Sequence, residues 1–78
     1  MKNLIKTLLK VKNEAEMKNL ILGLFTPSEI KEFEQRIEIV KMLKKGVGQH
    51  DIAAKLNVGV ATVSRGSKEI KMGRFLTI

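Results

Sequence analysis

The sequence predicts an all-α protein folded as one domain, residues 1–78, and three observations point to this class. Apolar residues recur three and four positions apart, which places them on one face of an α-helix. Residues that begin and end helices separate these periodic segments. A chain this short buries a marginal core, yet 44% of its residues are hydrophobic. We therefore expect a second copy of the chain to cover part of the apolar surface.

The first twelve residues, 1–12, predict an amphipathic helix. Its apolar residues share one helical face: Leu4, Ile5, Leu8 and Leu9. Lysines fall on the opposite face, and two of them interrupt the apolar run that a secretory signal needs. Such a stripe is typical of a helix that docks on a core or a partner. A helix lying on an anionic membrane is the alternative.

A second helix is predicted over residues 14–24. Asn13 offers an N-cap side chain, and Glu16 stands three residues later in the capping-box position. Apolar residues at helical spacing continue as far as Leu24. This segment should pack one face against another part of the protein.

The longest helix is predicted to begin after Thr26 and to run to Lys45. Thr26 is the expected N-cap, Pro27 takes the first helical position, and Glu29 closes the capping box. Gly46 follows as the C-terminal cap. Apolar residues keep a spacing of three to four along the whole segment, so this helix is the expected spine of the fold.

Residues 49–71 predict two short helices joined by a tight turn. Gln49 opens the first helix, and Asn57 stands where the chain bends, because Asn enters the left-handed region at low cost. Gly59 can cap the second helix, which begins at Val60. Two helices so connected can cross steeply, as in a helix-turn-helix. An ordinary helical hairpin is the alternative.

The outer side of this second helix carries short, hydroxylated and cationic side chains, which suit a helix laid into a DNA major groove. Small side chains allow close approach, hydroxyls bond bases or phosphates, and arginine reads guanine or holds phosphate. The residues expected at base edges are Val60, Ala61, Thr62 and Ser64, with His50 and Arg65 beside them. The residues expected at phosphates are Lys55, Lys68 and Lys71.

Charge and composition narrow the class of function. The formal net charge is +7, and it resides in the two ends of the chain, since residues 13–45 are neutral. A basic protein attracts a polyanion such as DNA. Without cysteine and with one histidine, the chain has no disulfide and no metal centre to build, and a reducing cytoplasm is the expected location. No carboxylate pair, histidine relay or phosphate-binding glycine loop is present, so we expect no enzyme.

Three segments, L-F-T-P-S-E (24–29), Q-R-I-E-I-V (35–40) and A-T-V-S-R-G-S (61–67), resemble the bacterial tryptophan repressor family in order and separation. The resemblance implies an intertwined homodimer that regulates transcription, as a repressor, by binding a palindromic operator in double-stranded DNA. Two heads would enter successive major grooves about 34–36 Å apart. Residues 1–45 would then form the dimerisation helices, residues 49–71 the reading head, and residues 72–78 a short tail expected to fray or to pack on a partner.

That family also binds L-tryptophan as a corepressor between the long helix and the reading head. Arg36 and Arg65 match the two arginines that flank the indole plane, and Thr26 matches a threonine that helps to hold the carboxylate. Gly66 matches a position close against the ligand. Glu69 departs from the family, which has a small hydroxyl residue near the ligand's amino group. A carboxylate there can pair with that ammonium, or it can block or repel a ligand carboxylate.

Other departures leave alternative functions open. His50 replaces a base-contacting arginine of the family and Ala53 replaces a lysine, which predicts a different operator. Related repressor-like proteins keep the scaffold and reading head without a known corepressor, so a ligand-independent DNA-binding protein is one alternative. A basic helical module that binds an acidic protein or a membrane surface is another.

Overall fold

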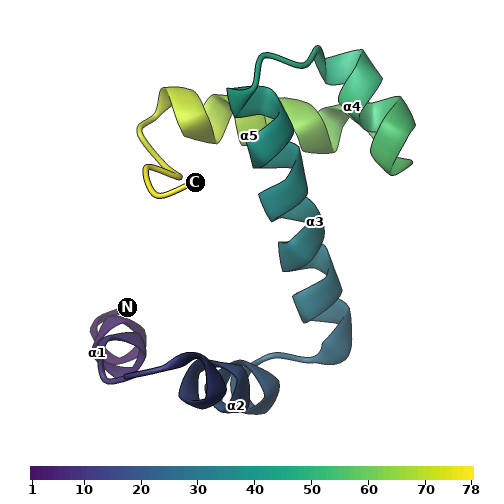
Figure 1. The fold of residues 1–78 in the computed structure, drawn as a ribbon. Helices are drawn as coiled ribbons and strands as arrows, with labels where there is room; N and C mark the ends of the chain where they lie inside the picture. Colours follow the sequence, from purple (N-terminus) through teal and green to yellow (C-terminus); the bar gives the residue numbers. More distant parts are fainter. The chain divides into compact units, whose positions relative to one another are not determined.

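The computed structural model describes residues 1–78 and contains five α-helices and no strand (Figure 1). The helices are α1 (Lys2–Leu9), α2 (Glu14–Leu24), α3 (Pro27–Lys44), α4 (Gln49–Leu56) and α5 (Val60–Lys71). The all-α class is therefore confirmed. The chain forms two compact units, Met1–Lys31 and Glu32–Ile78.

Side chains cap α2 and α3 where the sequence predicts helix starts. Asn13 Oδ1 accepts the Glu16 N–H at 2.9 Å, while Glu16 Oε1 accepts the N–H of Lys12, one residue earlier than a standard capping box, at 2.9 Å. At α3 the box is reciprocal. Thr26 Oγ1 accepts the Glu29 N–H at 3.1 Å, and Glu29 Oε1 accepts the Thr26 N–H at 2.9 Å. These bonds satisfy donors that a helix start otherwise leaves unpaired.

The Met1–Lys31 unit has no buried side chain. On α1 the exposed fractions are 42% for Leu4, 48% for Ile5 and 79% for Leu9, so the apolar stripe of this helix is uncovered. On α2, Leu22 and Leu24 are exposed as well. Side chains cap the starts of α2 and α3, but this unit has no core of its own.

The core lies in the Glu32–Ile78 unit, where the C-terminal half of α3 packs against α4 and α5 (Figure 1). Ile39 of α3 meets Ile52 of α4 and Val63 of α5, and all three are at most 1% exposed. Ala53, 7% exposed, completes the cluster. The half-buried apolar residues around it are Met42, Leu43, Val47, Leu56 and Val58. One spine helix, α3, thus holds both helices of the helix-turn-helix.

The turn between α4 and α5 has the geometry that its residues predict. Asn57 is left-handed, with φ 54° and ψ 51°, and the next N–H, from Val58, donates to Ala53 O at 3.0 Å. Gly59 is the extended N-cap of α5. At the end of α3, Gly46 has a φ of 86° and donates to Leu43 O at 3.0 Å. The predicted helix-turn-helix is present.

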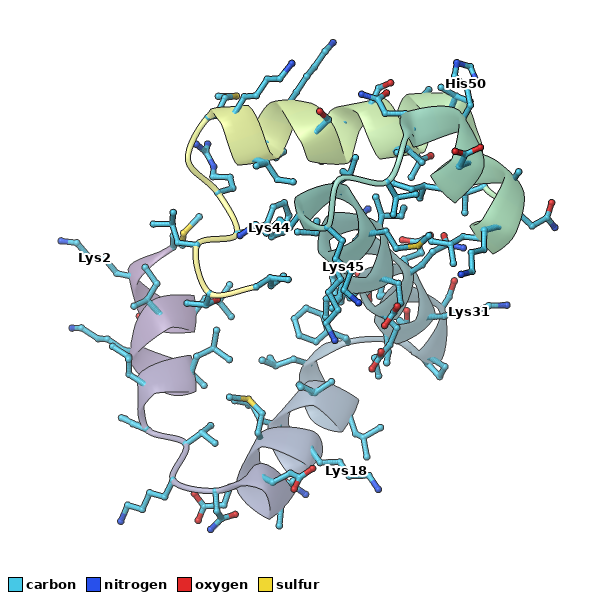
Figure 2. The ribbon with its side chains drawn as sticks, turned by 45° about the horizontal axis from the view of Figure 1, so that its top comes forward. Lys2, Lys18, Lys31, Lys44, Lys45 and His50 are labelled. Atoms are coloured by element: carbon cyan, nitrogen blue, oxygen red, sulfur yellow. The ribbon has the colours of Figure 1, made fainter.

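The tail after α5 does not fray. Gly73 and Phe75 have φ values of 90° and 59°, both in the left-handed region, which turns the chain back. The ammonium of Lys44, at the end of α3, donates to the carbonyls of Phe75 and Ile78 (Figure 2). The tail thus contacts the end of α3 in its own unit, and packing on a partner stays a prediction.

Candidate nucleic-acid interface and adjoining pocket

The helix α5 has a buried face and an open face. Val63 is fully buried, and Gly66, Ser67 and Ile70 are half-buried beside it, at intervals of three and four. The exposed residues of α5 within the predicted DNA-contacting set are Val60, Ala61, Thr62, Arg65, Lys68 and Lys71. The core under one face therefore fixes which side of α5 is offered to a partner.

Residues of α4 extend this open surface. His50 lies in the first turn of α4 and projects into solvent, and Lys55 is exposed near the end of the helix (Figure 2). Ser64 differs from the other predicted DNA-contacting residues in its exposure to solvent. It is half-buried, and its hydroxyl donates to Gln49 Oε1 at 2.6 Å. This bond ties the first turn of α4 to α5, and a base-edge role for Ser64 stays a prediction.

Positive charge on the reading head is unpaired. The cations of residues 49–71 are Lys55, Arg65, Lys68 and Lys71. The chain's one salt bridge, between Arg74 and Glu69, involves none of them. These four charges are therefore free to contact phosphates, and their attraction to a polyanion falls as salt is added.

A cavity of about 330 Å³ adjoins the open face, in the size range of small-ligand sites. α3 lines it with Arg36, Ile39 and Val40, and α5 lines it with Thr62, Arg65, Gly66 and Glu69. Phe75 adds a wall from the tail. The four α5 residues are spaced three, four and seven apart from Thr62, so one helical face supplies them all.

Gly66 lies where α5 packs against α3. A Cβ atom at this position would be 3.4 Å from Ile39 Cγ2 and 3.5 Å from Leu43 Cδ1, which is ordinary contact. There is room for a methyl group and for little more. A larger side chain at Gly66 would push the two helices apart.

The pocket combines charges of both signs with an apolar wall. The guanidinium of Arg36 lies 5.5 Å from the ring centroid of Phe33, within cation–π range. Arg65 is exposed at the rim. Glu69 Oε2 lies 3.4 Å from Arg74 Nε. Guanidinium groups suit carboxylates and a carboxylate suits an ammonium, so this arrangement can receive a zwitterion.

Four of the five residues that the family resemblance assigned to a ligand site line this pocket. Arg36, Arg65, Gly66 and Glu69 lie around one cavity, while Thr26 lies in the other compact unit, where its hydroxyl caps α3. Binding of a ligand by these residues stays a prediction. Four of the lining residues were not assigned to the pocket from the sequence: Ile39, Val40, Thr62 and Phe75. Thr62, assigned to base edges, also lines the pocket, and its spacing from Arg65 and Glu69 was the available signal.

Phe75 had no such signal, because its position depends on the path of the tail and not on a helical period. No group of three or more side chains in the structure could hold a metal ion. None of the five helices combines the length and the apolar character required to cross a bilayer.

The fold and this surface define a helix-turn-helix protein with a pocket beside its second helix. The chain belongs to the Trp repressor protein family, whose model matches residues 1–74, as the sequence resemblance indicated. A Trp operon repressor homolog from Vibrio vulnificus strain YJ016 is 41% identical over 66 residues, covering 80% of the chain and 65% of the relative. A Trp operon repressor homolog from Mannheimia succiniciproducens is 35% identical over 69 residues, which cover 87% of the chain and 68% of that relative.

A third relative of the same name, from Vibrio cholerae, is 42% identical over 53 residues, which cover 67% of the chain and 52% of that protein. The chain thus spans 65% of the Vibrio vulnificus protein and a smaller part of the Vibrio cholerae protein. No solved structure matches the chain significantly.

Proposed function

We propose that this chain is a transcriptional repressor that acts in the cytoplasm by binding double-stranded DNA, without catalysis. The observation that carries the proposal is the open face of α5, where Ala61, Arg65 and Lys68 are exposed while Val63 holds the opposite face in the core. Membership of the Trp repressor family supports the same function. A helix held in this way can lie in a major groove with its small and hydroxylated residues at base edges.

The proposed complex contains two copies of the chain on a palindromic operator. The uncovered apolar side chains of α1 and α2 support a dimer, because a stripe such as Leu4, Ile5 and Leu9 is costly to leave in water. Each copy presents one α5, and the dimer fixes the half-site spacing at about 34–36 Å. Lys55, Lys68 and Lys71 hold phosphates on either side of the groove.

We further propose that the pocket binds L-tryptophan as a corepressor. Arg36 and Arg65 offer guanidinium groups to the carboxylate and the ring, Ile39 and Val40 offer apolar surface, and Glu69 faces the ammonium. Thr26 stays a proposed ligand residue on the family resemblance alone. Because the pocket lies between α3 and α5, a bound ligand would fix the angle of α5, and ligand and DNA affinities would rise together.

DNA binding is tested by selecting duplexes from a random pool and measuring fluorescence anisotropy with the selected and a scrambled sequence. We expect the selected duplex to bind at least about a thousandfold more tightly, with a steep loss of affinity as salt rises. Equal affinity for both duplexes would remove the sequence-specific function. Retention on anionic vesicles without binding to either duplex would favour the interaction module.

The corepressor is tested separately by calorimetry with L-tryptophan and by repeating the DNA titration at saturating ligand. The expected results are heat of binding and a tighter complex with the selected duplex. Specific DNA binding that does not respond to the ligand would leave a ligand-independent repressor. This outcome retains the function of α5 and removes the effector.

A further inference from the structure

The tail contributes Phe75 to the pocket wall and places Arg74 against Glu69, another residue that lines the pocket. Arg74 Nε lies 3.4 Å from Glu69 Oε2, and the next residue, Phe75, forms part of the cavity wall. Side chains of Arg74 and Glu69 are 58% and 33% exposed, so the pair lies at the mouth and not in the core. Arg74 thus offers Glu69 a cation, and Phe75 gives the pocket a phenyl ring. An aromatic amine would offer the same two kinds of group, an ammonium and a ring.

Independent contacts hold the tail in this position. The Gly73 N–H donates to Ile70 O and the Arg74 N–H to Glu69 O, each at 3.0 Å. Phe75 has a φ of 59°, a conformation that a residue with a side chain rarely adopts without support. That support comes from Lys44, whose ammonium binds the carbonyls of Phe75 and Ile78.

We propose that Arg74 is an internal competitor for the Glu69 side of the pocket, and that a ligand must displace Arg74 from Glu69 in order to bind. The ligand class is an α-amino acid with an aromatic side chain, because its carboxylate suits Arg65 and its ammonium competes with Arg74 for Glu69. The inference rests on the effector part of the proposed function. It adds that affinity is lowered by the chain's own tail.

The test is calorimetric titration of L-tryptophan into the wild-type chain and three variants. Arg74→Gln removes the competing cation and should tighten binding by about two- to fivefold, as expected from the strength of exposed ion pairs. Arg74→Lys keeps a cation and should match the wild type. Lys41→Ala, which removes an exposed charge of α3 outside the pocket lining, should also match it.

The same titrations with 3-(indol-3-yl)propanoate, which lacks the ammonium, identify the group that competes. This anion should gain nothing from Arg74→Gln, or bind more weakly, because the freed Glu69 carboxylate repels it. Three results would each overturn the proposal. Arg74→Gln could bind L-tryptophan as well as or more weakly than the wild type does, it could gain the same affinity for both ligands, or no variant could bind L-tryptophan at all. Circular dichroism melts confirm that all variants fold.

Anisotropy with the selected duplex is recorded on the same samples. Absence of specific DNA binding by the wild type would count against the proposed function. Specific DNA binding without any L-tryptophan binding would remove the effector and, with it, the competition by Arg74. Specific DNA binding combined with either of the other overturning titration results would remove the competition by Arg74 alone.

Discussion

Thr26 and Glu29 exchange two hydrogen bonds at the start of α3, and the exchange has an electrostatic consequence. The Thr26 backbone N–H, and then its side chain, stabilise the carboxylate and lower the pKa of Glu29 below its ordinary value. Because the folded pKa lies below the unfolded one, the carboxylate adds stability at pH values above the unfolded pKa. This contribution is lost as the pH falls through the lowered folded pKa.

We expect Glu29→Gln to lower the melting temperature near neutral pH, with the difference vanishing in acid below the lowered pKa of Glu29. Circular dichroism melts of both proteins across this pH range provide the measurement. Glu34→Gln is the matched control, since Glu34 is an exposed carboxyl of the same helix without a hydrogen bond. A difference between wild type and Glu29→Gln that is independent of pH would contradict the assigned role.

At Gly66 the spacing of α3 and α5 predicts opposite effects for two substitutions. Gly66→Ala places its Cβ in ordinary contact with Ile39 and Leu43 and improves helix propensity, so stability should hold or rise by up to about 1 kcal/mol. Gly66→Leu overpacks the crossing and should cost about 1–3 kcal/mol. Urea unfolding of both variants measures these changes in the free energy of unfolding. Similar decreases for Gly66→Ala and Gly66→Leu would show that α3 and α5 pack differently at this position.

At the scale of elements, the helices follow from local signals. The caps at Asn13 and Thr26, the left-handed Asn57 and the glycine at 46 set boundaries that agree with the structure to within a residue. Such signals act over one turn, so a single sequence contains them. The fold class and the helix-turn-helix were predictable for this reason.

The pocket was predictable only where a helix supplies its walls. Family resemblance identified Arg36 and Arg65, and the period of α5 could have added Thr62. Phe75 and the Glu69–Arg74 pair depend on how the tail turns back after α5, which is decided by left-handed residues and by the distant Lys44. Contacts across more than thirty positions leave no periodic trace in the sequence.

The open face of α5 also predicts how affinity depends on salt. Lys68→Ala should weaken binding to specific and scrambled duplexes by similar factors and reduce the slope of log affinity against log salt by about 1, because one phosphate contact is lost. Anisotropy titrations over a series of salt concentrations measure both quantities. Lys41→Ala serves as the comparison, and an equal change in slope for both variants would indicate a general effect of net charge.

At the scale of the whole molecule, burial is unequal between the two compact units. The Glu32–Ile78 unit contains every buried side chain, and the Met1–Lys31 unit contains none. An apolar face without a cover costs about 25 cal/mol for each Å² left in water, so the exposed side chains of the N-terminal helices support the proposed dimer. This is the basis for expecting stability to depend on protein concentration.

Leu9→Lys should therefore shift the molecule from dimer to monomer, because it puts a charge on the exposed stripe of α1. Sedimentation equilibrium at several loading concentrations measures the shift, and specific DNA affinity should fall with it. Lys10→Ala, on an exposed lysine of the same segment, should leave the association unchanged. A wild-type protein that sediments as a monomer at every concentration would refute the dimer.

Thr62 and Arg65 stand on the border between the open face of α5 and the pocket behind it. Under the proposed function, each of these side chains contacts DNA on one side and the ligand on the other. A substitution that changes ligand preference at either position would then also change the preferred DNA sequence, so the two specificities could not evolve independently.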